Sequence, residues 1–142
     1  MKAKISWSTE AQFLAEAESQ HTVLMDGPSE YGGKNAGPRP MEMILMGIGG
    51  CAAFDVVHIL KKGHQNLLSC NAQVDAVRSS QIPAVFTKIH LHFDVIGMKL
   101  KENIVRNAVK LSAEKYCSAS IMLKKGGVEI THSFKVSEHP TK

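Results

Sequence analysis

The chain has 142 residues, of which 44% are hydrophobic and 21% are charged, with a formal net charge of +4 at pH 7. This length suits one domain, and we expect a single domain over residues 1–142. The basic residues are scattered, and only five Phe, two Tyr and one Trp are available to stack on bases, so we expect no nucleic-acid partner.

The N-terminal part predicts three short strands followed by a loop. Apolar and polar residues alternate in "KAKISW" (residues 2–7) and in "QFLAEAES" (12–19), as in half-buried strands. A third strand is expected in "HTVLMD" (21–26). The next segment, "GPSEYGGKNAGPRP" (27–40), holds four Gly and three Pro and is typical of an exposed loop.

A long helix is predicted from Pro40 to Lys62. Pro40 suits a first helical turn, Glu42 complements the positive end of the helix dipole, and Gly63 suits a C-terminal cap. Nearly every face between these ends is apolar, so we expect a partner subunit to cover part of the helix. The longest uncharged apolar run, residues 43–54, is shorter than the about 20 residues that span a bilayer, so no membrane partner is expected.

The C-terminal half predicts two strands, two helices and a last strand. The second strand, residues 85–97, is expected to place alternate side chains on its inner face: Val85, Thr87, Ile89, Leu91, Phe93 and Val95. An amphipathic helix over 100–117, a short helix over 118–126 and a strand over 128–137 follow. The element order predicts an α+β fold without regular βαβ alternation.

Three glycines stand in the middle of the predicted long helix, directly before a cysteine. Gly47, Gly49 and Gly50 each weaken a helix by about 1 kcal/mol relative to Ala, which indicates a close approach by another helix or by a substrate. Cys51 follows them, and two interpretations stay open for it: a small buried apolar residue, or a reactive thiol that another segment activates.

The number and spacing of the cysteines indicate free thiols rather than structural disulfides or zinc ligands. Cys51, Cys70 and Cys117 form no CxxC pair and no zinc-ribbon spacing, and the N-terminus lacks the apolar segment of a signal peptide. We therefore expect a cytoplasmic protein in which any disulfide is catalytic rather than structural. Cys117 is expected between two helical segments, where the N-terminus of the second helix would lower its pKa.

Two stretches carry a family resemblance. "PMEMILMGIGGCAAFDVV" (40–57) and "LSAEKYCSASIML" (111–123) resemble the OsmC/Ohr superfamily of bacterial hydroperoxide-reducing proteins, and within it the YhfA-like branch. The resemblance implies the OsmC-like fold, with antiparallel sheets around a long buried helix in an intertwined homodimer. It also implies that Cys51 is the peroxidatic cysteine and Cys117 the resolving cysteine.

The activating groups depart from the family pattern. The resemblance implies an arginine from the N-terminal strands and a glutamate near the start of the central helix, yet no arginine precedes Arg39 and position 41 is Met41. The carboxylate comes one residue later, at Glu42, which is a rotation of about 100° on a helix. We therefore treat Arg39 and Glu42 as candidate activating residues, with Lys34 as a weaker substitute for the arginine.

Other polar residues are weighed as structural. Asp55 lies one helical turn after Cys51 and is interpreted as one side of an interface salt bridge, because a carboxylate near a thiol opposes thiolate formation. His90 and His92 are expected on an exposed polar sheet face, and His132 as a hydrogen-bonded core histidine. We expect no metal and no cofactor.

The sequence leaves two functions open. The first is a cysteine-based thiol peroxidase that reduces organic hydroperoxides through a Cys51 sulfenic acid and a Cys51–Cys117 disulfide, which an external dithiol reduces. Apolar residues that would suit such a substrate are Met43, Met46, Ile48 and Phe54, which are equally good core residues. The alternative is a non-catalytic small-ligand-binding or redox-sensing protein, which the missing N-terminal arginine favours.

Overall fold

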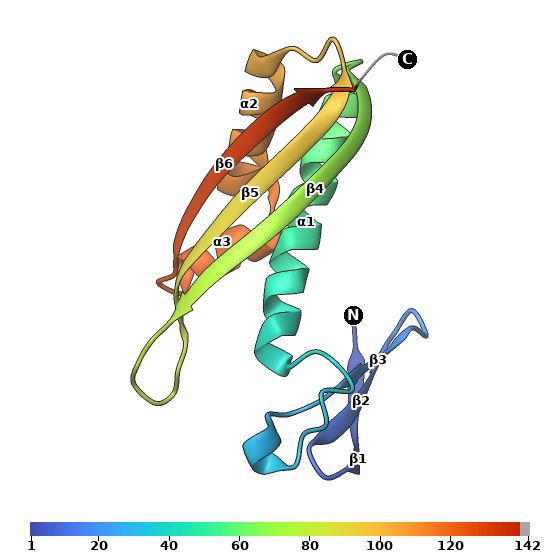
Figure 1. Cartoon of the computed structure of the whole chain (residues 1–142), viewed down its shortest axis with the longest axis vertical. Helices are drawn as coiled ribbons and strands as arrows, with labels where there is room; N and C mark the ends of the chain where they lie inside the picture. The colour runs from blue at the N-terminus through green and yellow to red at the C-terminus, as the bar shows by residue number, and fades with distance from the viewer. Residues whose placement is uncertain (140–142) are drawn as a thin grey trace. The chain divides into compact units, whose positions relative to one another are not determined.

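The computed structural model describes residues 1–139 and separates into two compact units, residues 1–44 and the remainder from residue 45. Figure 1 shows the order of the elements along the chain. The fold is mixed α+β, as predicted, with a three-stranded sheet in each unit. The expectation of one domain over residues 1–142 stays a prediction.

The first unit is built on an antiparallel sheet in the order β1-β2-β3. The three predicted strands are confirmed as β1 (Ala3–Thr9), β2 (Gln12–Ala17) and β3 (Thr22–Met25). In the β1–β2 pair, Ile5 lies opposite Ala15 and Trp7 opposite Phe13. Every residue of β1 is exposed in the single chain.

Asp26 organises the glycine-rich loop that follows β3. Its side chain is 1% exposed and accepts backbone hydrogen bonds from Gly27 (2.8 Å), Lys34 (2.9 Å) and Ala36 (3.0 Å). The loop also contains one 3-10 turn, η1 (Ser29–Tyr31). One buried carboxylate therefore satisfies three backbone N–H groups of this loop, which lacks the regular backbone hydrogen bonds of a helix or a sheet. No pattern in the sequence indicates this role.

Helix α1 has the predicted bounds, Pro40–Lys62. A side chain caps its N-terminus: the backbone N–H of Arg39 donates to Oε2 of Glu42 at 2.8 Å. This is the hydrogen bond that the third helical residue makes in a capping box. Along the helix, every fourth residue is fully buried: Ile48, Ala52, Val56 and Leu60. Full burial of an Ile, Val or Leu side chain stabilises a fold by about 1.5–3 kcal/mol each, so this stripe anchors the helix.

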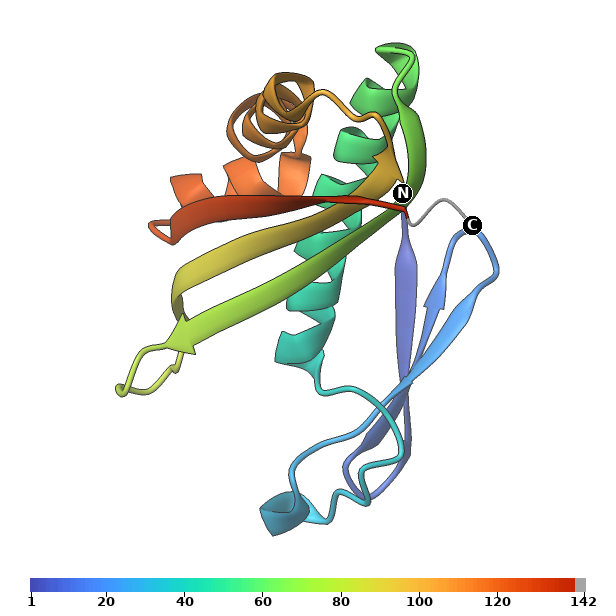
Figure 2. The same ribbon diagram turned by 45° about the horizontal axis from the view of Figure 1, so that its top comes forward.

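The second unit places its helices on one face of a three-stranded sheet (Figure 2). The sheet, in the order β4-β5-β6, buries Ile89, Leu91, Phe93 and Val95 of β5 against the helices, as predicted for these four. The remaining elements are β4 (Asn66–Arg78), β5 (Phe86–Met98), α2 (Glu102–Leu111), the π-helical turn η2 (Ser112–Tyr116), α3 (Ser118–Lys125) and β6 (Glu129–Glu138).

Three details differ from the sequence-based expectations. The second sheet is mixed rather than antiparallel, because β5 and β6 are joined by a crossover through α2 and α3 and therefore pair in parallel. The helix expected over 100–117 ends at Leu111 and gives way to η2. Val85 and Thr87 are exposed while Phe86 is buried. The pairing of β4 with β5 shifts by one residue between Val77 and Arg78, so the inward and outward positions at the start of β5 are the reverse of those expected.

Helix α1 is long and apolar enough to cross a membrane by length and composition, and 28% of its most apolar 18-residue window is buried. The core helix of a soluble protein meets the same criterion. One stripe of α1, from Ile48 to Leu60, is fully buried in the single chain.

Candidate active site

The structure brings Cys51 and Cys117 together. Cys51 lies on α1 and is half-buried, whereas Cys117 is fully buried at the junction of η2 and α3. All three cysteines of the chain are free thiols, and the sulfur atoms of Cys51 and Cys117 lie within 4.8 Å of each other. The two residues are 66 positions apart in sequence, so the packing of η2 and of its junction with α3 against α1 creates this pair.

Backbone hydrogen bonds hold Cys117 in place. Its Sγ caps α3 by accepting from the backbone N–H of Ser120 at 3.4 Å, and its thiol lies 4.0 Å from the carbonyl oxygen of Ile48 on α1. The backbone N–H of Cys117 donates to Ser112 O at 2.9 Å, and the Ser112 hydroxyl donates to Ala52 O at 2.9 Å. A π-helical turn of this kind is frequent at functional sites.

The pKa of Cys117 differs from the sequence-based expectation. Burial raises the pKa of this thiol, the cap from Ser120 lowers it, and the neighbouring Cys51 raises it, with burial the largest effect. The net direction is upward, so the prediction of a lowered pKa is wrong. The helix N-terminus acts as expected, but desolvation of the thiolate outweighs it.

Asp55 completes a cluster with the two thiols. A carboxylate oxygen of Asp55 and the two sulfur atoms all lie within 4.8 Å of one another. Oδ2 of Asp55 is buried and has no hydrogen-bond partner among the described residues. The interface salt bridge expected for Asp55 stays a prediction. Burial raises the pKa of this carboxyl, and the nearby His58 opposes the shift.

Asp55 also lines a pocket of about 660 Å³. The pocket lies beside α1 and the end of α2 and offers both apolar walls and polar groups. Its other lining residues are His58, Ile59, Lys62, Gly63, Leu111 and Tyr116. Ile48, which was weighed as a substrate contact, is instead a core residue. A small molecule in this pocket would therefore meet the carboxyl of Asp55.

Only one of the three helix glycines is required by packing within the chain. A Cβ atom on Gly49 would lie 2.8 Å from Cγ2 of Val74 on β4, which is too close for a carbon contact. A Cβ on Gly47 or Gly50 would meet no atom of the described residues within 4 Å. Close approach by the sheet therefore explains Gly49, whereas Gly47 and Gly50 face open surface in the single chain.

Arg39 and Glu42 lie at the start of α1, and both are exposed. The Glu42 carboxylate accepts the backbone N–H of Arg39, while the Arg39 guanidinium makes no ion pair with any residue from 1 to 139. Lys34, the weaker candidate, pairs with Glu10 at 3.4 Å. Arg39 is thus the less engaged of the two candidate cations.

The histidines of the second sheet have hydroxyl partners. His90 contacts the hydroxyls of Thr131 (2.7 Å) and Ser133 (2.7 Å), and His92 contacts the same Ser133 hydroxyl at 2.7 Å. Within the described part of the chain, the only group of three donors close enough to hold a metal ion is that of Cys51, Asp55 and Cys117. The expectation that the protein uses no metal stays a prediction.

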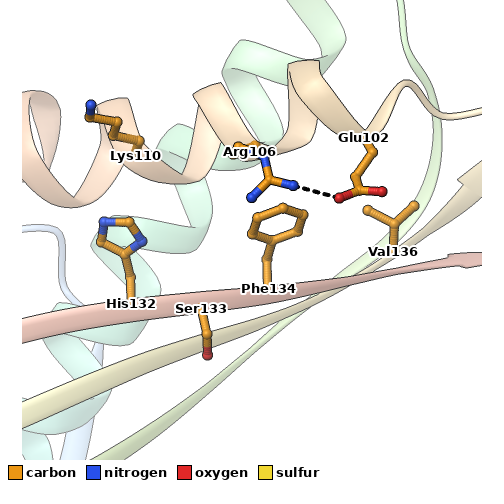
Figure 3. Close-up of a pocket in the computed structure, with 7 residues that line it drawn as sticks. All are labelled: Glu102, Arg106, Lys110, His132, Ser133, Phe134 and Val136. Carbon is orange, nitrogen blue, oxygen red and sulfur yellow. Dashed lines mark hydrogen bonds and ion pairs between the residues drawn. The ribbon is translucent and has the colours of Figure 1, made fainter.

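His132 lies in a second pocket, between α2 and β6, rather than in the core. Its Nε2 is 3.4 Å from Oε1 of Glu114, and the side chain is 26% exposed. In the same pocket, of about 550 Å³, Arg106 lies 5.1 Å above the ring of Phe134 and pairs with Glu102 at 2.6 Å (Figure 3). The paired arginine and its aromatic neighbour stabilise the contact between α2 and β6.

Comparison with known proteins decides the family. The model of the OsmC-like protein family matches residues 32–133, which include both Cys51 and Cys117. The chain belongs to the OsmC-like family. It is also 49% identical to Protein YhfA of Escherichia coli K12 over 136 residues, covering 96% of this chain and 98% of that protein.

Solved structures share the fold. A hypothetical protein from Aquifex aeolicus superposes with a TM-score of 0.84 at 29% identity, over 98% of this chain and 97% of that one. An organic hydroperoxide resistance protein OsmC from Legionella pneumophila superposes with a TM-score of 0.73 at 18% identity, over 95% and 96% of the two chains. The predicted OsmC/Ohr resemblance and the predicted OsmC-like α+β fold are confirmed, whereas the intertwined homodimer stays a prediction.

Proposed function

We propose that the protein is a cysteine-based thiol peroxidase that reduces organic hydroperoxides. The observation that carries this proposal is the approach of two free thiols, Cys51 and Cys117, to within 4.8 Å inside an OsmC-like fold. Pairing of a half-buried thiol with a buried one suits a peroxidatic and a resolving cysteine. The name of the Legionella relative, which refers to organic hydroperoxide resistance, is consistent with this substrate class.

The proposed reaction has three steps. The Cys51 thiolate attacks the terminal oxygen of the hydroperoxide, which forms a sulfenic acid and releases an alcohol. The Cys117 thiol then attacks the sulfur of the sulfenic acid, which forms the Cys51–Cys117 disulfide and releases water. An external dithiol reduces the disulfide by thiol–disulfide exchange and is itself oxidised. No cofactor takes part in these steps.

We propose Arg39 as the cation that favours the Cys51 thiolate and Glu42 as the residue that positions it. The Arg39 guanidinium makes no ion pair with any residue from 1 to 139, and the backbone N–H of Arg39 donates to Glu42. Arg39 precedes Cys51 by 12 residues, about 18 Å along the rise of α1, so a second copy of the chain would bring this guanidinium to Cys51. Arginine stays charged at all working pH values, which suits the role.

We further propose a homodimer of single OsmC-like domains in the bacterial cytoplasm. The described residues of the first unit bury no apolar side chain, and its sheet exposes Trp7 (68%) and Ile5 (56%). On α1, Phe54 (71%) and Met46 (58%) are also exposed, beside the open positions Gly47 and Gly50. A second copy of the chain would cover this apolar surface.

The test is stoichiometric reduction of cumene hydroperoxide by the reduced protein, followed by intact mass and disulfide mapping. We expect one equivalent to be consumed with formation of a Cys51–Cys117 bond. Cys51→Ser should consume none, and Cys117→Ser should consume one equivalent and accumulate a sulfenic acid that dimedone traps. Cys70→Ser, which removes a half-buried thiol on β4, is the matched control and should behave like the wild type.

Slow consumption that leaves both thiols intact would favour the second candidate, a small-ligand-binding or redox-sensing protein. The pocket of about 660 Å³ beside Asp55 is the observation that favours this candidate.

A further inference from the structure

Asp55 occupies a position for which the reaction proposed above gives no role. It lies four residues after Cys51 on α1, so both side chains project from the same face of the helix. Its carboxylate is within 4.8 Å of both sulfur atoms, and one of its oxygens is buried without a hydrogen-bond partner among residues 1–139. A buried carboxyl oxygen without a hydrogen bond lowers the stability of the folded state. Such a group in a folded protein therefore calls for an explanation, and a catalytic role is one.

The surroundings of Asp55 favour proton exchange over a fixed negative charge. The groups that face it are the thiols of Cys51 and Cys117 and the imidazole of His58, and Lys62 and Tyr116 line the same pocket. Three acidic groups within 4.8 Å of one another do not all ionise together, because each anion raises the proton affinity of the next. The cluster is therefore suited to passing one proton among its members.

The proposed peroxidase reaction requires such a transfer. Cys51 enters as a thiol and reacts as a thiolate, so its proton must leave. The departing alkoxide must gain a proton before it becomes an alcohol. Arg39, the proposed activating cation, stabilises an anion but holds its own protons too tightly to supply one.

Building on the proposed peroxidase, we propose that Asp55 carries the proton of the Cys51 thiol to the leaving alkoxide. The Asp55 carboxylate accepts the proton as the sulfur attacks the terminal oxygen of the hydroperoxide. The S–O bond forms, the O–O bond breaks, and the carboxyl group returns the proton to the alkoxide. Sulfur is oxidised by two electrons, the peroxide is reduced by two, and Asp55 ends unchanged.

The same carboxylate serves the second step. The Cys117 thiol stays protonated at neutral pH because burial raises its pKa, so it needs a base when it attacks the Cys51 sulfenic acid. Asp55 accepts that proton as the S–S bond forms and the S–O bond breaks, and delivers it to the departing hydroxide, which leaves as water. One residue within reach of both sulfurs thus moves both protons.

The test compares two reactions of Cys51 in the wild type and in Asp55→Asn. Alkylation by iodoacetamide needs only the thiolate, because iodide leaves without a proton. Hydroperoxide reduction also needs a proton for the leaving group. We expect Asp55→Asn to reduce hydroperoxide about 10²–10⁴-fold more slowly, the usual contribution of general acid–base catalysis, while its alkylation is unchanged or faster.

Asp75→Asn on the exposed face of β4 is the matched control and should leave both rates unchanged. A second measurement needs no variant. In the wild type, the rate of hydroperoxide reduction should fall in deuterated water more than the rate of alkylation does, because only the first reaction has a proton in transfer.

The outcomes separate the two proposals. If wild-type Cys51 consumes hydroperoxide no faster than its alkylation rate indicates, the proposed function fails, and the relay fails with it. If the wild type is a fast peroxidase and Asp55→Asn equals it or exceeds it, only the relay is overturned. A parallel loss of both reactions in Asp55→Asn would give Asp55 a structural role and would also overturn the relay.

Discussion

At Cys117, burial and helix capping act on the thiol in opposite directions. The cap from the Ser120 N–H could be anticipated from the position of Cys117 before a short helix. The burial could not, because it depends on the contact with Ile48 and on the π-helical turn beside α1. Side-chain chemistry at a single residue is therefore set by both its sequence neighbours and its distant contacts.

Asp26 supports a prediction about pH and stability. Hydrogen bonds from Ala36, Lys34 and Gly27 hold the pKa of the Asp26 carboxyl below the ordinary value of 3.8. A carboxyl with a lowered folded-state pKa stabilises the fold above its unfolded-state pKa and loses this effect as the pH falls through the folded-state pKa. We expect Asp26→Asn to unfold more easily than the wild type at pH 7, with a difference that shrinks below pH 3.8.

Urea unfolding from pH 7 down to pH 2, with Asp75→Asn as the surface control, tests this prediction. A destabilisation by Asp26→Asn that stays constant over the whole range would contradict it, because the effect would then not depend on ionisation of Asp26.

In helix α1, the local sequence determines the two ends and the pattern of buried residues. Pro40, Glu42 and Gly63 define its ends, and the structure places them as the pattern predicted. The burial of every fourth residue from Ile48 to Leu60 also follows from the helical period. The role of Gly49 does not, because Val74 comes from a strand 25 positions later in sequence.

Substitution of Gly49 tests this contact. A methyl group at Gly49 would lie 2.8 Å from Val74 Cγ2, so we expect Gly49→Ala to lower the free energy of unfolding by about 1–3 kcal/mol through overpacking. In a Val74→Ala background the space is released and the cost should be smaller, which a double-mutant cycle measures by urea unfolding. An equal cost in both backgrounds would show that Val74 is not the residue that excludes the methyl group.

At the scale of the whole molecule, the exposed apolar surface supports the proposed homodimer. We expect Phe54→Asp to weaken the proposed homodimer at least about 100-fold, because a charge would be buried without a partner, and 100-fold in Kd corresponds to about 2.8 kcal/mol. Sedimentation equilibrium of the wild type and the variant measures this. Ile82→Asp, at a side chain that is 98% exposed in the loop after β4, is the control and should stay dimeric. A monomeric wild type, or a Phe54→Asp variant as dimeric as the wild type, would contradict the proposed interface.

The sequence by itself determined the strands, the long helix, the α+β class and the family, because these depend on local periodicity, end signals and motifs. Only the tertiary structure decided that Cys51, Asp55 and Cys117 share one cluster and that β5 and β6 run parallel. Asp55 was interpreted from sequence as half of a salt bridge, since spacing indicates which residues share a helix face but not what packs against it. Desolvation and long-range contacts exist only once the chain is folded, and they are what changes a carboxylate near a thiol into a candidate proton carrier.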